Sequence, residues 1–319
     1  QSTHGIDPPV QILMSISFFM LIDCRMKEKI KTGISVLIIL ILLPYVAAVF
    51  RTGSMSGTEE PARQAGVEDL VAEILPAQMP VSYEEEALKA QAVIVRTNLL
   101  RQAMSFYGSG TAAEAAEAVR ESDLEALGFT FYPREEQIRL WGYDSWEQYA
   151  EKCGKAAEST AGQVLVTEAA EEEGTLPDLP YHAVSAGWTR GGSLLGEDYS
   201  WLESAECPDD LQSSDYLKIE TLDLDEVPQI VSRDEAGYVT EVSVQGETLG
   251  GEEFRSLYGL NSSCFTVEQT ETGVRITTKG LGHGLGMSMY QANLLALEGM
   301  QYQEILHYFY KNTQCISFS

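Results

Sequence analysis

The stretch "EEEALKAQAVIVRT", Glu84 to Thr97, decides the fold because it predicts a helix that is apolar on almost every side. Three carboxylates stand at its start, and apolar residues then recur at helical spacing. A helix of this kind is buried on most of its sides. The sequence therefore predicts a central buried helix, with Ser82 and Glu85 forming a capping box at its start.

The three acids at the start of this helix have two interpretations. Carboxylates in the first turn stabilise a helix by about 0.3–1 kcal/mol each, and this role suits Glu84 and Glu85. Glu86 points elsewhere, along the helix face that continues through Ala90 and Val93. A carboxylate at the start of a buried helix lies where a cleft can end. Glu86 is therefore a candidate catalytic residue, with helix stabilisation as the alternative.

A second informative stretch is "KGLGHGLGMSMYQANLLALEG", Lys279 to Gly299, in which glycines alternate around His283. Glycines let the backbone approach a ligand or a neighbouring chain segment closely. Ser288 and Gln291 form a second capping box, so the loop leads into a helix. The glycine spacing differs from that of nucleotide-binding loops, and the GxSxG motif of serine hydrolases is missing. His283 is either a site residue or a structural hydrogen-bonding residue in a tight loop.

The remaining periodicities predict a mixed fold in which helices come first, strands follow, and helices close the chain. Helices are expected at 111–127, 144–160, 289–299 and 302–311, and strands at 162–168, 180–187, 237–246, 264–271 and 273–280. Segregated helices and strands of this kind are typical of the α+β class, with antiparallel strands. We expect the folded body to span residues 67–319, behind a small polar linker at 52–66.

An uncharged apolar run from Ile34 to Phe50 precedes the linker and has the length of a short membrane span. Basic residues before it favour a cytoplasmic N-terminus. We therefore predict that residues 26–51 anchor the protein in the cell membrane as a single span. The folded body then lies outside the cytoplasm. A cleaved signal peptide is the alternative. Residues 1–25 precede "MKEKIK", which reads like a natural start, so they are interpreted as an upstream or artefactual segment.

Charge and cysteine usage exclude several functions. The chain has 21 Lys and Arg against 48 Asp and Glu, a net charge of −27, which repels nucleic acid and anionic lipid. Its five cysteines form no CxxC pair and no zinc-like cluster. The charge therefore argues against a nucleic-acid partner, and the cysteine spacing gives no sign of a zinc cluster.

Two motifs together resemble the stage II sporulation protein D family, which also includes amidase-enhancer proteins. They are "EALKAQAVIVRT", from Glu86, and "GHGLGMSMYQANLLALEGMQYQEILHYFYKNT", from Gly282. Between them, "YHAVSAGWT" and "EEFRSLYGLNSSCF" look like two further family segments. The resemblance covers roughly residues 67–313. Asn98, Met289 and Gln291 depart from the family pattern, where Tyr, Gln and Gly are usual.

The resemblance implies a lytic transglycosylase that cleaves the MurNAc–GlcNAc bond of peptidoglycan during engulfment in sporulation. The family's catalytic glutamate falls on Glu86, and one acid suffices because the sugar's own C6 hydroxyl attacks C1 to give a 1,6-anhydro product. Five further residues are expected to line or support the glycan cleft: Gln91, Arg96, His283, Ser288 and Tyr290. The implied partners are peptidoglycan strands, the membrane, and a sporulation amidase with a membrane partner. The reaction that the resemblance implies needs no metal and no organic cofactor.

Other functions remain open on the sequence. The main alternative is a non-catalytic wall-binding protein that enhances a cell-wall amidase, and a third possibility is a membrane-tethered scaffold.

Some relatives bind zinc through a histidine and nearby cysteines. Here the next cysteine after His182 is the distant Cys207, so the resemblance implies no zinc site in this chain.

Overall fold

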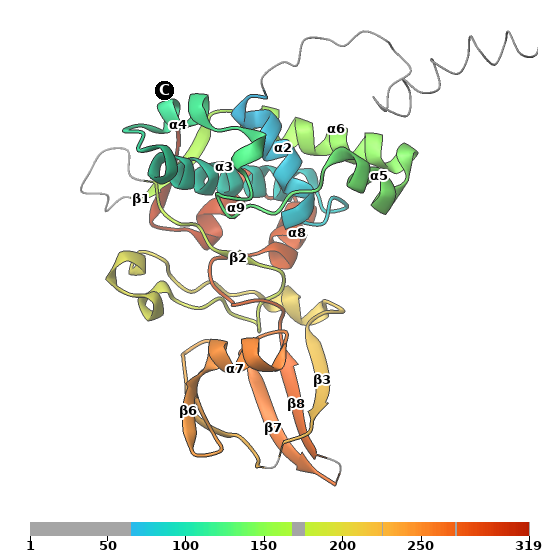
Figure 1. The fold of residues 1–319 in the computed structure, drawn as a ribbon, viewed down its shortest axis with the longest axis vertical. Coiled ribbons are helices and arrows are strands. Elements are labelled where there is room, and N and C mark those ends of the chain that lie inside the picture. The colour runs from blue at the N-terminus through green and yellow to red at the C-terminus, as the bar shows by residue number, and fades with distance from the viewer. Residues whose placement is uncertain (1–64, 168–175, 225, 272, 319) are drawn as a thin grey trace, which may run out of the picture. The chain divides into compact units, whose positions relative to one another are not determined.

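The computed structural model describes residues 65–167, 176–224, 226–271 and 273–318. These residues belong to one compact unit, Ala65–Ser319. Helices and mostly antiparallel sheets are mixed in it (Figure 1), which confirms the predicted α+β class. The predicted anchor at 26–51 lies outside the described residues. Within the part of the chain that the structure describes, no helix is both long and apolar enough to cross a membrane.

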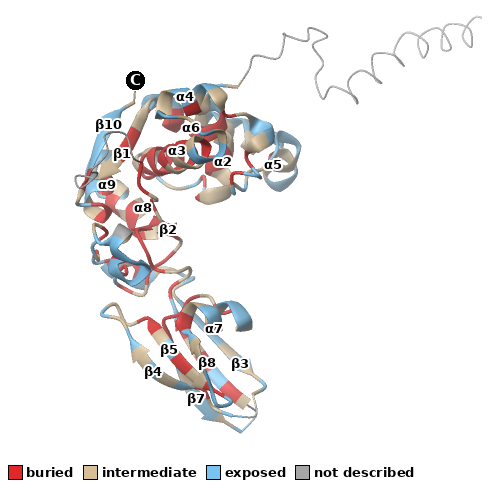
Figure 2. Cartoon of the chain, turned by 60° about the vertical axis from the view of Figure 1, so that its left-hand side comes forward, coloured by how far each residue is buried: buried red, intermediate tan, exposed pale blue. Residues whose placement is uncertain are grey.

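Helix α3 (Glu85–Tyr107) is the central helix and is buried on nearly every side, as predicted (Figure 2). It packs against α2 (Val67–Gln78) and α6 (Tyr143–Ser159), and also contacts two helices near the end of the chain. These are α8 (Met289–Leu297) and α9 (Tyr302–Phe309). The two motifs of the sequence therefore meet in one hydrophobic core.

The start of α3 differs from the prediction. Its N-cap is Glu84 rather than Ser82. The backbone N–H of Glu84 donates to Asn293 Oδ1 at 2.7 Å, and that of Tyr83 donates to the carbonyl of Pro80 at 3.0 Å. The turn before the helix and the contact from α8 thus determine where α3 begins. A capping pattern in the local sequence cannot predict a contact with a distant helix.

The predicted helix at 111–127 is also interrupted. It divides into α4 (Ala112–Ala118) and the short η1 (Glu121–Asp123). Between them, Val119 is buried and has an extended backbone. Burial of this side chain outweighs the helix propensity of the alanine-rich segment. Helix α5 (Arg134–Trp141) follows and packs against α6.

Two small sheets join distant parts of the chain. Strands β1 (Gln163–Thr167) and β10 (Thr313–Ser317) pair antiparallel. Strands β2 (Tyr181–His182) and β9 (Met287–Ser288) pair in parallel. This pairing places the glycine-rich loop, residues 279–287, beside the segment that begins at β2. Short 3₁₀ turns then connect this segment to the sheets that follow: η2 (Gly192–Leu195), η3 (Glu197–Tyr199) and η4 (Pro208–Gln212).

A second hydrophobic core lies between two three-stranded antiparallel sheets and one helix, α7 (Gly251–Tyr258). The first sheet has the order β3 (Leu217–Leu222), β8 (Gly273–Lys279), β7 (Phe265–Thr270). The second has the order β4 (Gln229–Arg233), β5 (Val239–Val244), β6 (Glu247–Gly250). Phe254 of α7 stacks on Phe265 with ring centroids 5.1 Å apart, which joins the helix to β7.

Candidate functional site

The glycine-rich loop packs its backbone tightly against its neighbours. Gly284 and Gly286 both have positive φ, at 80° and 67°. A Cβ on Gly286 would lie 1.8 Å from the carbonyl oxygen of Pro180, and one on Gly284 would lie 2.4 Å from the ring of Tyr238. Glycine is therefore required at both positions by conformation and by space.

Two histidines meet at this loop. The rings of His182 and His283 lie 5.8 Å apart between centroids. Nδ1 of His283 accepts a hydrogen bond from the Leu285 N–H at 3.1 Å, and Nδ1 of His182 lies 3.0 Å from the Leu285 carbonyl oxygen. Burial lowers the pKa of both rings, that of His182 to about 3, and each is further lowered by neighbouring positive charge. Both imidazoles are therefore neutral at physiological pH.

A buried arginine holds the loop from the other side. Arg190 donates from Nη1 to the His283 carbonyl at 3.3 Å and to Glu252 at 2.8 Å, and from Nε to Asp234 at 2.7 Å. Its backbone N–H donates to the Gly284 carbonyl at 2.7 Å. Arg190 thereby ties the loop to α7 and to the turn after β4. The sequence analysis missed these residues, because their contacts join segments that are far apart in the chain.

Ser288 lies at the N-cap of α8, as predicted, and its hydroxyl accepts from the Gln291 N–H at 3.4 Å. The same hydroxyl contacts both carboxylate oxygens of Asp210, at 2.9 and 2.7 Å. Asp210 is fully buried and also accepts from the Ser185 N–H at 2.6 Å. Burial raises the pKa of Asp210 to about 6, against hydrogen bonds that lower it. The sequence analysis also missed Asp210.

Tyr290 brings the second motif close to the first. Its backbone N–H donates to the Ala183 carbonyl at 3.1 Å. Burial raises the pKa of Tyr83, in the turn before α3, to about 12, and Tyr290 is the next largest cause. Tyr290 therefore lies near the start of α3, within electrostatic reach of Tyr83.

Glu86 is partly exposed, with 20% of its side chain accessible. Oε1 accepts from Lys89 Nζ at 2.7 Å, and Oε2 accepts from the backbone N–H of Tyr302 at 2.9 Å. Lys89 also lies 2.8 Å from Glu85. Within the described residues, Glu86 makes no hydrogen bond to any of the other predicted site residues. The structure thus brings Glu86 to the start of α9.

Gln91 and Arg96 are fully buried in α3. The Arg96 guanidinium pairs with Glu68 and donates to the carbonyls of Gln163 and Ala157, at 3.1 and 2.9 Å. Neither amide atom of Gln91 has a partner among the described residues. Both side chains point into the protein, so they support α3 from inside and do not face solvent.

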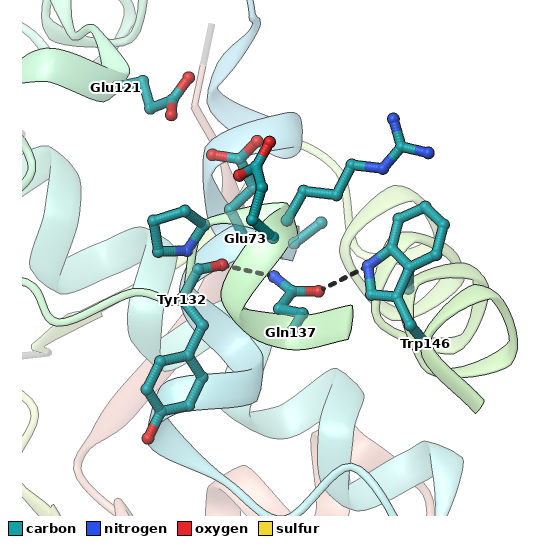
Figure 3. Close-up of a pocket in the computed structure, with 10 residues that line it drawn as sticks. Glu73, Glu121, Tyr132, Gln137 and Trp146 are labelled. Atoms are coloured by element: carbon teal, nitrogen blue, oxygen red, sulfur yellow. Dashed lines mark hydrogen bonds between the residues drawn. The ribbon is translucent and has the colours of Figure 1, made fainter. Parts of the chain in front are cut away.

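A separate cavity of about 330 Å³ lies among α2, α5 and α6, and its lining contains none of the predicted site residues (Figure 3). Gln137 donates to the Tyr132 carbonyl at 2.6 Å and accepts from the Trp146 indole at 3.1 Å. Burial, and then the charge of Glu121, raise the pKa of Glu73 to about 7. The two motifs that contain Glu86 and His283 do not contribute to the lining of this cavity.

The described residues contain no group of three or more His, Cys, Asp or Glu side chains arranged to hold a metal ion.

Residues 56–166 match the family described as "Stage II sporulation protein". The chain is 29% identical over 287 residues to stage II sporulation protein D of Bacillus subtilis (strain 168), which covers 85% of this chain and 79% of that protein. The predicted resemblance to the stage II sporulation protein D family is confirmed. Stage II sporulation protein D of Bacillus amyloliquefaciens is also 29% identical, over 84% of this chain and 78% of its own length. An amidase enhancer of Bacillus subtilis (strain 168) is 26% identical over 77% of this chain, but over only 40% of its own length.

Proposed function

We propose that the protein is a lytic transglycosylase that cleaves the MurNAc–GlcNAc bond of peptidoglycan during sporulation, with Glu86 as its catalytic residue. The observation that carries the proposal is the place of Glu86. It is a partly exposed carboxylate of the family motif, and both of its oxygens are held on helices that pack together. Fixed carboxylates on rigid elements suit general acid–base catalysis.

In this reaction one carboxyl group serves two steps. Protonated Glu86 gives its proton to the glycosidic oxygen as the bond from that oxygen to C1 of N-acetylmuramic acid breaks. The C6 hydroxyl of the same sugar then attacks C1, and its proton passes to Glu86, which restores the acid. Holding the hydroxyl near C1 makes the attack intramolecular and favours it over attack by water.

Lys89 has to release Glu86 before the first step. The ammonium group lies within ion-pair distance of both Glu85 and Glu86, at 2.8 and 2.7 Å. When a sugar oxygen approaches Glu86, Lys89 can keep its bond to Glu85 and give up the other. The retained bond to Glu85, whose side chain is 57% exposed, keeps the ammonium group of Lys89 paired during the exchange.

The other predicted site residues act in two groups in this proposal. Gln91 and Arg96 support α3 from the interior. His283, Ser288 and Tyr290 belong to the glycine-rich loop and the start of α8, and we infer that this segment borders the glycan. The proposal also includes an anchor at 26–51 that keeps the body outside the cytoplasm, near newly exposed wall and a sporulation amidase.

A non-catalytic enhancer of a cell-wall amidase is the second candidate. It is favoured by the similarity to the Bacillus subtilis amidase enhancer. It is also compatible with Glu86 serving as a structural link between α3 and α9. In that case the chain binds the wall, and Glu86 transfers no proton.

Digestion of purified glycan strands by the full chain tests these alternatives, with mass spectrometry of the product ends. Ends in 1,6-anhydro-N-acetylmuramic acid that vanish in Glu86→Gln are the expected result. Reducing muramic acid ends alone indicate a hydrolase and require a second carboxylate. Glycan strands that stay intact, combined with wall hydrolysis that is faster with the amidase and this chain than with the amidase alone, indicate the enhancer.

A further inference from the structure

Trp188 and Glu206 lie opposite each other in an isolated antiparallel bridge. The residues that flank them exchange two backbone hydrogen bonds of 2.8 Å each, from the Thr189 N–H to the Ala205 carbonyl and from the Cys207 N–H to the Gly187 carbonyl. Trp188 and Glu206 are therefore a non-hydrogen-bonded pair. The Cβ atoms of such a pair lie about 4.5–5.5 Å apart, and the two side chains leave the backbone on the same face.

This face of the bridge is open to solvent. The four flanking residues are buried, whereas Glu206 is exposed and Trp188 is 48% exposed. Buried and exposed residues thus alternate on both segments, and the alternation places the indole ring on the outer face. A ligand that covers this ring gains free energy by removing its apolar surface from water.

The polar groups of the pair are available to a ligand. Glu206 accepts a hydrogen bond from Tyr308 only through its backbone carbonyl. Within the described residues, its carboxylate makes no hydrogen bond and no ion pair, and the indole N–H of Trp188 has no acceptor. The pair therefore presents a flat apolar ring, an acceptor and a donor side by side.

The Trp188 side of the bridge is fixed to the glycine-rich loop. Thr189 Oγ1 accepts from the Ala205 N–H at 2.8 Å, which adds to the bonds of the bridge. One residue further, the backbone N–H of Arg190 donates to the Gly284 carbonyl at 2.7 Å. The ring thus stands on a backbone that is fixed before any ligand binds, which lowers the entropic cost of binding.

The Glu206 side of the bridge is fixed to α9. The hydroxyl of Tyr308 donates to the Glu206 carbonyl at 2.7 Å. Tyr302, whose backbone N–H holds Glu86, lies six residues earlier on the same helix. With a rise of 1.5 Å per residue, the two tyrosines are separated by about 9 Å along the helix axis. The bridge is therefore joined both to the loop and to the helix that contacts the proposed catalytic residue.

The chemistry of the pair decides between two kinds of ligand. A pyranose ring has apolar faces of C–H groups and hydroxyls around its edge, so it suits an indole face beside a carboxylate. A cation also suits a ring and a carboxylate. However, a net charge of −27 attracts cations to the whole surface and gives no reason for a tryptophan at this position.

We propose that Trp188 and Glu206 form a sugar-binding subsite of the glycan site. The indole ring stacks on the C–H face of one sugar unit, and the Glu206 carboxylate accepts from a hydroxyl or an amide N–H at the edge of that sugar. The inference rests on the proposed function for its substrate class. It adds two binding residues that lie outside the two sequence motifs.

Binding of chitotetraose, a neutral oligosaccharide, to the full chain tests the subsite by calorimetry and by tryptophan fluorescence. We expect Trp188→Ala to weaken binding about tenfold and to abolish the ligand-induced change in emission. Glu206→Gln should weaken binding about threefold to tenfold, because a hydrogen bond to a charged acceptor is lost. Phe106→Ala is the matched control: this ring is 55% exposed, and it lies in the last turn of α3, whereas Glu86 lies in the first.

Chitotetraose that binds Trp188→Ala as tightly as the unmodified chain, or that binds neither, overturns the subsite. A peptide of four lysines distinguishes the second ligand class. If the peptide changes the emission of Trp188, chitotetraose does not, and the effect disappears in about 0.5 M salt, the pair binds a cation and the proposal is wrong.

The subsite and the proposed reaction can fail separately, because binding is measured without cleavage. A chain that binds chitotetraose through Trp188 but yields no anhydro ends keeps the subsite and loses the transglycosylase. If the chain does cleave glycan strands, Trp188→Ala should raise KM and leave kcat within about twofold, since uniform binding is removed. Cleavage with an unchanged KM keeps the transglycosylase and overturns the subsite.

Discussion

The backbone N–H of Tyr302 donates a hydrogen bond to Glu86 Oε2 at 2.9 Å. The bond joins the first turn of α3 to the first turn of α9, which lie at opposite ends of the folded body in sequence. A carboxylate at a helix N-terminus accepts from amides that have no partner inside the helix and interacts favourably with the helix dipole. Glu86 therefore has a structural contact as well as its proposed catalytic role, and the two can be separated by substitution.

Glu86→Gln is expected to lower glycan cleavage by about 10²–10⁴-fold, because an amide transfers no proton. Its oxygen can still accept from Tyr302, so the loss of unfolding free energy stays below about 1 kcal/mol. Product release from glycan strands measures the first effect, and urea unfolding measures the second. Glu85→Gln is the control, because that side chain is 57% exposed and pairs with Lys89 at 2.8 Å on the helix surface. A folded but inactive Glu85→Gln would show that the wrong carboxylate was chosen.

Arg96→Met is expected to reduce the free energy of unfolding by about 3–5 kcal/mol, because it leaves a partly buried carboxylate and two buried carbonyl groups without their partner. The guanidinium is 0% exposed and links α2, α3, α6 and β1 through Glu68 and three further groups. The urea midpoint measures the change. Arg275→Met provides the control, since its pair with Glu268 is exposed and worth under about 1 kcal/mol. Equal effects of the two substitutions would contradict a structural role for Arg96.

The sequence predicts the elements whose burial follows a local period. Helix α3 is buried on nearly every side, and β8 alternates between buried and less buried residues. Strands β3 and β4 were not predicted because most of their side chains remain partly or fully exposed. Their pairing is set by backbone hydrogen bonds to β8 and β5, and none of their side chains is fully buried.

The site was predictable to a smaller extent, for the same reason. The capping pattern predicts Ser288 correctly as an N-cap, and the structure confirms it. Its bond to Asp210 joins residues 78 positions apart, and the bond from Arg190 to the His283 carbonyl spans 93. No local spacing encodes such contacts, because they depend on how the two cores are connected.

Ser288→Ala is expected to reduce the free energy of unfolding by about 1–3 kcal/mol, since it removes an N-cap and a hydrogen-bond donor to the buried Asp210. The pKa of Asp210, already raised to about 6 by burial, should rise further because this hydrogen bond lowers it. Asp210→Asn and the variant with both substitutions complete a double-mutant cycle, which measures the coupling free energy between the two side chains. We expect a coupling of about 0.5–3 kcal/mol from urea unfolding. Additive effects would mean that the two side chains do not act together.

Glu73 gives the protein a pH-dependent stability that its cavity explains. Burial and the neighbouring charge of Glu121 raise its carboxyl pKa from 4.5 to about 7 in the folded chain. Between these values the unfolded chain releases the proton while the folded chain keeps it. This contribution to stability is therefore fully present below pH 4.5, is lost as pH rises through 7, and stays lost above it. After allowance for solvent screening, the loss is about 1–2 kcal/mol.

Glu73→Gln removes the titrating group. As pH rises from 4.5 to 8, the free energy of unfolding of the variant should therefore rise by about 1–2 kcal/mol relative to that of the unmodified chain. Urea unfolding at the two pH values measures the difference for each protein. Glu117→Gln is the control, because Glu117 is exposed on α4 and is not among the residues that line the cavity. Since Oε2 of Glu73 is buried without a partner among the described residues, its charged form is the one that folding disfavours. A difference between variant and unmodified chain that is constant with pH would show that Glu73 titrates normally and that the cavity admits enough water to solvate it.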